Sequence, residues 1–191
     1  MGIELTKEQE LLKLLFKDFS VQYNGRNVSK KLGLSHSGAF RILKRLENKE
    51  IVRSKLVGNA RIYSLNSENP VTFKEIDTIL TIESLKQKRW VEEFNQLEDK
   101  ANFVLLFGSI LRNDKYARDI DLLIIADKKN HRNIRGIIKE RNKISNKPIH
   151  AITQTPEEFK LDLNRKYKVT IEIIRTGIVL SKQENFIRAM V

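Results

Sequence analysis

The sequence of 191 residues contains no cysteine, and this absence removes several kinds of chemistry at once. Disulfide bonds, thiolate zinc sites and cysteine nucleophiles are all excluded. Long hydrophobic runs are also missing, because no apolar stretch approaches the roughly 20 residues that a membrane helix needs. The start, MGIELTKEQE, is too acidic and polar for a secretory signal. We therefore expect a cytoplasmic protein that has no membrane partner.

Positive charge, in contrast, is abundant. The formal net charge is +12, in a sequence with 40% hydrophobic and 31% charged residues, a mixture typical of folded domains. Residues 29–61 carry nine Lys or Arg against two acids, and residues 128–147 carry eight against Glu140 alone. Such a field favours polyanionic partners such as nucleic acids or nucleotide phosphates, although a Lys-rich surface without a partner would have the same composition.

The first 50 residues carry the end signals of three helices. Thr6 followed by Gln9 has the spacing of a capping box at the start of an amphipathic helix. Gly25 is expected in the turn that follows, and Gly33 marks the end of a short second helix. Ser35 is expected to cap a third helix, which carries much of the basic charge.

Two short predicted strands then flank Gly58 and Asn59. Both residues tolerate the positive φ that a tight hairpin turn requires. Three helices and a hairpin are the order of a winged helix-turn-helix domain, which we place at residues 1–68. Residues 6–67 resemble the winged-helix domains of archaeal and bacterial regulators, and this resemblance favours DNA as a partner.

In a helix-turn-helix motif, which here consists of the second and third predicted helices, the later helix enters the major groove and its first residues contact base edges. Arginine and lysine can neutralise phosphates or reach guanine edges. We therefore expect DNA contacts from the third helix, the helix before it and the hairpin, at Lys30, Lys31, His36, Ser37, Phe40, Arg41, Lys44, Arg45, Lys55 and Arg61. Winged helices also serve as protein-interaction modules, and this alternative stays open.

Residues 69–100 are predicted to form connecting helices, because their apolar residues recur at spacings of three and four. They could also support dimer contacts, and a homodimer fits the common state of winged-helix regulators. In residues 101–191 short apolar strands alternate with helices, so the whole chain is predicted to be α+β, with a small mixed sheet in this last domain. The segment Lys168–Arg175 fits either a strand or a helix.

The sharpest chemical signal is a pair of motifs on two of these strands. The first strand ends in Gly108-Ser109, which frees backbone N–H groups at a helix start and suits a triphosphate. The next strand begins with Asp119-Ile120-Asp121, whose two acids lie on the same face because they are two residues apart. Two neighbouring carboxylates suit Mg²⁺, which prefers oxygen ligands and shares them with phosphates.

Residues 100–185 resemble the nucleotidyltransferase superfamily of DNA polymerase beta, and most closely the small minimal nucleotidyltransferases of prokaryotes. The resemblance implies that Gly108, Ser109 and Arg112 bind the nucleotide. It also implies that Asp119 and Asp121 hold Mg²⁺ and carry catalysis. ATP is the substrate that the resemblance implies, with transfer of AMP to a hydroxyl group on a protein or a small molecule.

The sequence departs from the pattern of this superfamily at several positions. Asn113 stands where many members have Gly, and Arg118 stands where many have Ser and could pair with a neighbouring carboxylate. Most importantly, the position that matches the third metal-binding carboxylate holds His150. Histidine is a poor Mg²⁺ ligand, although it can act as a base near neutral pH. Other acids that could take the place of the third carboxylate are Glu157, Glu158 and Asp162.

Three functions follow from these patterns. The first is an enzyme that transfers AMP from ATP to a hydroxyl acceptor, as related minimal transferases do to a partner protein. The second is a transcriptional regulator whose transferase domain is catalytically degenerate and serves nucleotide sensing or assembly; the missing third acid favours it. The third, nucleotide addition to an RNA end, is compatible with both basic clusters but ranks last, because the chain lacks the extra RNA-binding domains that such enzymes usually carry.

Overall fold

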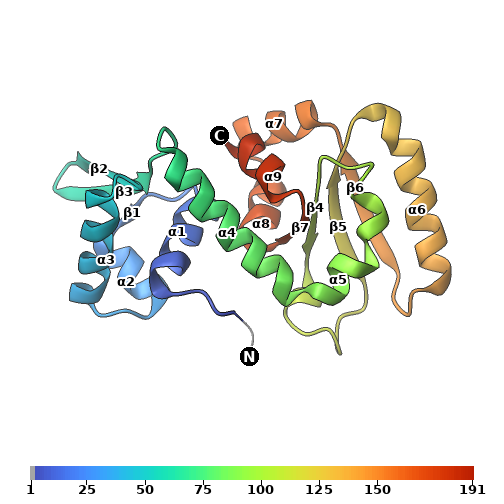
Figure 1. Cartoon of the computed structure of the whole chain (residues 1–191), viewed down its shortest axis with the longest axis horizontal. Coiled ribbons are helices and arrows are strands. Elements are labelled where there is room, and N and C mark those ends of the chain that lie inside the picture. The colour runs from blue at the N-terminus through green and yellow to red at the C-terminus, as the bar shows by residue number, and fades with distance from the viewer. Residues whose placement is uncertain (1–2) are drawn as a thin grey trace. The chain divides into compact units, whose positions relative to one another are not determined.

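The computed structural model of the chain describes residues 3–191 and divides it into two compact units, Met1–Ile79 and Leu80–Val191 (Figure 1). The division falls within one helix, α4 (Pro70–Lys86). The α+β fold class predicted from the sequence is confirmed, whereas the predicted domain limits of 68 and 100 stay a prediction. No helix in residues 3–191 is long and apolar enough to cross a membrane.

The first unit contains three helices and a small antiparallel sheet. The helices are α1 (Lys7–Lys17), α2 (Gly25–Leu32) and α3 (His36–Asn48). The strands are β1 (Tyr23–Asn24), β2 (Val52–Val57) and β3 (Ala60–Leu65), in the order β1-β3-β2. This is the arrangement of a winged helix-turn-helix, with β2 and β3 forming the wing.

The predicted helix ends are largely confirmed. Thr6 forms a capping box with Gln9, Gly33 adopts the left-handed conformation after α2, and the Ser35 side chain accepts a hydrogen bond at the start of α3. The expected turn at Gly25 is wrong, because Asn24 caps α2 and Gly25 is already its first helical residue.

The hairpin also differs in one detail from the prediction. Gly58 has a φ of 58°, whereas Asn59 is not among the described residues with positive φ. A two-residue hairpin turn of type II′, which requires a positive φ only at its first central residue, fits this pattern. Apolar side chains from all three helices, among them Leu11, Val28 and Leu43, form the core of the unit.

The second unit is built on a mixed four-stranded sheet. Its strands are β4 (Phe103–Phe107), β5 (Ile120–Ile125), β6 (Ile149–Gln154) and β7 (Ile178–Ser181), in the order β6-β5-β4-β7. Strands β5 and β6 run parallel, and the other neighbours are antiparallel. The central strands β4 and β5 are almost wholly buried, as continuous apolar runs predict.

Helices cover both faces of this sheet. One face packs against α5 (Lys88–Glu93), the 3-10 turn η1 (Asn95–Leu97) and α6 (His131–Ile144), which follows the turn η3 (Lys128–Asn130). The other face packs against α7 (Pro156–Asn164), α8 (Lys168–Thr176) and α9 (Gln183–Met190) (Figure 1). Phe103 of β4 meets Phe159 of α7 and Phe186 of α9 in edge-to-face contacts, each with ring centroids 5.3 Å apart.

Candidate functional site

Three side chains with metal-binding atoms meet at the start of β5 and β6. Asp119 directly precedes β5, and Asp121 is the second residue of that strand. His150 lies opposite Asp121 in the parallel pairing of β5 with β6. Because residues paired in this way share one face of a sheet, the register brings His150 to the two carboxylates.

The three side chains are close enough to share one ion. The Nδ1 atom of His150 lies 3.6 Å from an Asp119 carboxylate oxygen and 3.8 Å from one of Asp121. Each of the three residues offers a ligand atom within 4.8 Å of the others. The Asp121 side chain is 25% exposed and that of His150 is 62% exposed, so the cluster opens to solvent on the β6 side.

The carboxylates of Asp119 and Asp121 repel each other. Burial raises the pKa of the Asp121 carboxyl above its ordinary value, and the adjacent Asp119 carboxylate raises it further. His150 acts in the opposite direction on the same pKa. A cation between the two carboxylates would relieve this repulsion, so the electrostatics of the cluster fit a divalent metal.

The Gly108-Ser109 turn lies against the same cluster. Gly108 has a φ of 85°, and a Cβ atom on it would lie only 2.3 Å from an Asp121 carboxylate oxygen. Glycine is favoured here by its positive φ, and any side chain at this position would also displace the Asp121 carboxylate. The expected helix start after this turn is only a single 3-10 turn, η2 (Ser109–Leu111), so a long helix dipole does not contribute here.

A hollow of about 580 Å³ opens beside Gly108. Arg112 lines it after the 3-10 turn, and α8 contributes Lys168 and Glu172 from the other side. Two cationic side chains around such a space suit the phosphates of a nucleotide. Ser109, the remaining predicted nucleotide-binding residue, is not part of the lining. The sequence did not single out Lys168, because its segment fitted a strand as well as a helix.

The other acids considered for the third carboxylate do not join the cluster. The Glu158 side chain accepts a hydrogen bond from the Thr155 backbone at the start of α7. Asp162 accepts hydrogen bonds from Gln154 and Thr170. Within residues 3–191, the group of Asp and His side chains that could hold a metal contains no third carboxylate.

A lysine holds the segment that leads to the cluster. The Nζ atom of Lys147 donates to the backbone carbonyls of Asp114 and Ala117, at 2.7 and 2.5 Å. Arg118, in the same segment, is exposed, and among the described residues it forms no ion pair. The expected pairing of Arg118 with a carboxylate is therefore not observed.

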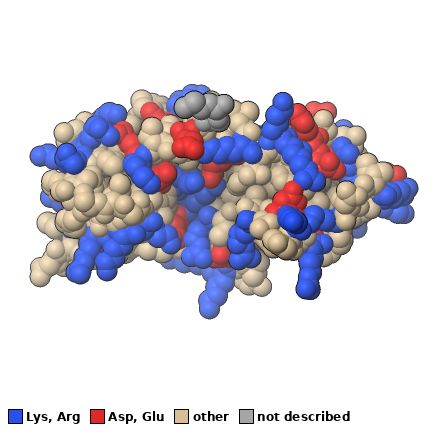
Figure 2. Space-filling view, turned by 90° about the horizontal axis from the view of Figure 1, so that it is seen from below, with Lys and Arg blue, Asp and Glu red and all other residues tan. Residues whose placement is uncertain are grey.

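The predicted DNA-contacting residues are all exposed on the first unit. They lie on α2 (Lys30, Lys31), on α3 (His36, Ser37, Phe40, Arg41, Lys44, Arg45) and on the wing (Lys55, Arg61). Half of the Phe40 surface is exposed, an unusual position for a large apolar side chain on a basic helix. Figure 2 shows one face of the molecule on which Lys and Arg side chains are spread widely, with acidic side chains scattered between them.

Two of these basic side chains form ion pairs with acidic residues of the same unit. Arg45 forms an ion pair with Glu8, which also lies 3.2 Å from Lys49. Arg61 lies 3.7 Å from Glu47. Arg41 and Lys44 have no ion-pair partner among the described residues, so their charges are the more available ones on α3.

A mixed sheet that carries a Gly-Ser turn and two carboxylates at neighbouring strand ends defines a nucleotidyltransferase-like domain. The family model described as "Polymerase beta, Nucleotidyltransferase" matches residues 90–185, which is half of the chain. The chain belongs to this family.

Among solved structures, the chain is similar to that of a single-residue mutant of ZitR from Lactococcus lactis. The two share 21% sequence identity with a TM-score of 0.36, over 50% of this chain and 64% of that one. This chain thus covers less than two thirds of that structure. No curated protein matches the chain.

Proposed function

We propose that the second unit binds a nucleoside triphosphate together with Mg²⁺ and transfers its nucleoside monophosphate to a hydroxyl acceptor. ATP is the proposed nucleotide. The observation that carries the proposal is the Asp121 carboxylate, which lies next to Asp119 and against Gly108, a residue that also lines the hollow. Family membership supports the same kind of reaction.

The residues present fit Mg²⁺, although not all of them equally well. Asp119 and Asp121 supply the oxygen ligands that Mg²⁺ prefers, whereas the imidazole of His150 is a weaker ligand for it. When bound, Mg²⁺ neutralises phosphate charge and helps the pyrophosphate to leave. The raised pKa of Asp121 opposes metal binding at acidic pH, because the carboxyl must lose its proton to act as a ligand.

Each remaining residue has a role in the same proposal. Arg112 and Lys168 neutralise the phosphate oxygens of the nucleotide in the hollow. His150, on the exposed side of the cluster, takes the proton of the acceptor hydroxyl as its oxygen attacks the α-phosphorus. The new oxygen–phosphorus bond then replaces the bond to pyrophosphate, which leaves with its electron pair.

The experiment that tests this proposal is a calorimetric titration of ATP, with and without Mg²⁺, into the wild type and an Asp119→Asn, Asp121→Asn variant. We expect Mg²⁺-dependent binding that the variant loses. A matched control is Asp99→Asn, Asp127→Asn, which removes the same charge from exposed positions of the same unit. Equal binding by all three proteins, or no binding by the wild type, would contradict the proposal.

A second candidate function is favoured by the histidine at position 150. A site without a third carboxylate can bind a nucleotide without turning it over, and the first unit would then carry the function as a DNA-binding regulator. Arg41 and Lys44 on α3, which are exposed and form no ion pair within residues 3–191, support DNA binding under either candidate. Release of pyrophosphate from bound Mg-ATP, measured in the presence of hydroxyl acceptors, separates the two, because only the enzyme releases it.

A further inference from the structure

Strand β6 is an edge of the four-stranded sheet, and most of its outer side is open. The Pro148 carbonyl accepts a hydrogen bond from Ile120, the first residue of β5, and the Gln154 carbonyl accepts one from Ala126, the residue after β5. The even-numbered residues of β6 therefore face β5, and the odd-numbered ones face outwards. No other described residue forms a hydrogen bond with the outward N–H and C=O groups of Ala151 and Thr153.

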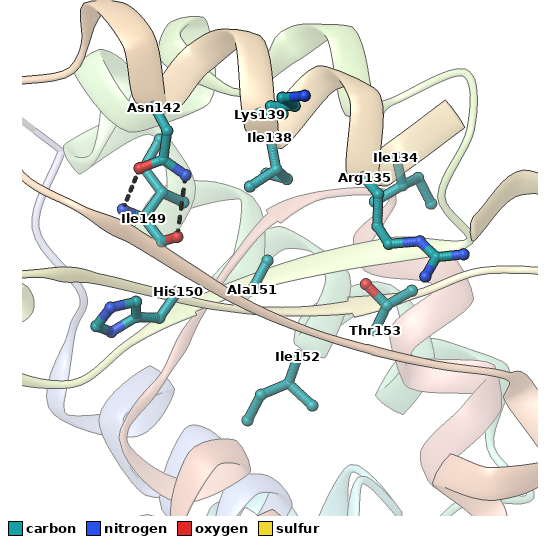
Figure 3. A pocket seen from close by; sticks show the side chains of 10 residues that line it. All are labelled: Ile134, Arg135, Ile138, Lys139, Asn142, Ile149, His150, Ala151, Ile152 and Thr153. Carbon is teal, nitrogen blue, oxygen red and sulfur yellow. Dashed lines mark hydrogen bonds between the residues drawn. The ribbon is translucent and has the colours of Figure 1, made fainter. Parts of the chain in front are cut away.

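One end of this edge is closed by a side chain. The amide of Asn142 on α6 accepts from the Ile149 N–H at 2.8 Å and donates to the Ile149 carbonyl at 3.2 Å (Figure 3). The Asn142 amide thus forms with Ile149 the two backbone hydrogen bonds that a neighbouring strand would form. The open part begins just after it, at Ala151.

A groove of about 580 Å³ runs along this edge between β6 and α6. Arg135 and Lys139, one helical turn apart on α6, line it, and neither forms an ion pair with any described residue. The described residues that line the groove include no acid. Figure 3 shows the Arg135 guanidinium above Thr153 on the α6 side, while His150 and Ile152 point away from α6.

We propose that this edge binds an extended acidic peptide segment of a partner protein, which adds a strand beside Ala151 and Thr153. Strand addition supplies alternating donors and acceptors to the two open residues. Side chains of the added strand that face α6 meet Arg135 and Lys139, and acids fit there. Side chains on the opposite face meet Ile152, which is 44% exposed, and apolar residues fit there. The recognised pattern is therefore an alternation of acidic and apolar residues.

Other occupants fit these observations less well. A second copy of the chain paired through β6 would bring two sets of Arg135 and Lys139 together, and like charges repel. A nucleic acid would satisfy the charges but offers no regular ladder of amide and carbonyl groups to the strand. Basic side chains beside an edge strand also prevent association of that edge with other copies of the chain. If this were their only role, the edge would bind no partner.

The test is fluorescence anisotropy with a labelled peptide of seven alternating Glu and Val residues and the full chain. We expect saturable binding that is weakened at least ~10-fold in an Arg135→Glu, Lys139→Glu variant. The matched control is Lys160→Glu, Arg165→Glu, which reverses two exposed charges at α7 and should bind like the wild type. Equal affinity of all three proteins, or no binding by the wild type, would overturn the proposal.

Two modified peptides separate strand addition from simple charge attraction. One carries N-methyl groups on the Glu amides, and the other carries them on the Val amides. Only every second residue of an added strand turns its N–H towards β6, so one peptide should lose binding ~10-fold and the other should keep it. Equal affinities of the two would overturn strand addition. An oligothymidine that binds the wild type but not the Arg135→Glu, Lys139→Glu variant would assign the groove to nucleic acid instead.

Discussion

Asp121 is a residue whose ionised form destabilises the fold. Its pKa is raised above the ordinary value near 3.8, so the folded chain holds this proton more tightly than the unfolded chain does. The destabilisation is absent at pH values below the ordinary pKa and develops as pH rises through the raised pKa. A residue placed at such a cost to stability is typical of functional sites.

We therefore expect Asp121→Asn to raise the melting temperature at pH 7, by about 2–4 °C if the relief is about 1 kcal/mol. The gain should be smaller at pH 4 than at pH 7, because protonation of the wild-type carboxyl removes the charge that the variant lacks. Differential scanning fluorimetry in EDTA at both pH values measures it. An unchanged or lower melting temperature at pH 7 would contradict this account of Asp121.

The sequence could predict some side-chain positions in the site but not others. The spacing of Asp119 and Asp121 correctly placed both on one face, because this depends only on strand geometry. The 3.6 Å approach of His150 depends on the parallel register of two strands separated by α6, which no local pattern contains. The pairing of Arg45 with Glu8 is equally invisible in the sequence, because 37 residues separate the two partners.

At the scale of one element, α3 carries two kinds of basic side chain. Arg41 and Lys44 form no ion pair with any residue that the structure describes, whereas Arg45 and the following Lys49 share Glu8. Cations that are already paired release fewer counterions when they meet a phosphate, because their charge is partly neutralised. The helix should therefore contribute unevenly to DNA binding.

We expect an Arg41→Ala, Lys44→Ala variant to bind duplex DNA ~10-fold more weakly than the wild type and to lower the salt slope by about 2. The matched control Arg45→Ala, Lys49→Ala removes the same charge from positions paired with Glu8 and should lose less affinity. Gel shifts or anisotropy over a salt series measure both. A larger loss in the control than in the test variant would contradict the expected division of α3.

Other elements show which local signals decide a structure. The capped helices α1 and α3 and the apolar strands β4 and β5 follow from end signals and continuous burial. The segment that forms α8 was ambiguous, since alternating and helical spacings both occur in it, and its packing against β4 selects the helix. Strand β7 was not predicted, because its four residues are too few to show a period.

For the whole molecule, the two proposed activities belong to different units. The candidate nucleotide site lies in Leu80–Val191, and the basic residues of α3 lie in Met1–Ile79. Substitutions at separate sites with no shared partners usually act independently. We therefore expect the Asp119→Asn, Asp121→Asn variant to keep its DNA affinity within about twofold, and the Arg41→Ala, Lys44→Ala variant to keep its Mg-ATP affinity equally well.

Paired titrations of each variant with both ligands measure this independence. A change of more than about tenfold at the unaltered site would instead reveal coupling between nucleotide and DNA binding, which is the behaviour of a nucleotide-regulated DNA-binding protein. Such coupling would favour the regulator that senses a nucleotide, because the proposed transfer reaction does not require nucleotide binding to affect DNA binding.

The contact between Gly108 and Asp121 has a consequence for comparing members of this family. A side chain at position 108 cannot coexist with the Asp121 carboxylate in its present place, since the first added carbon would already collide with it. A related sequence with any other residue at this point must have moved or lost that carboxylate. One position in an alignment thus marks the relatives in which this carboxylate cannot occupy the place that it has here.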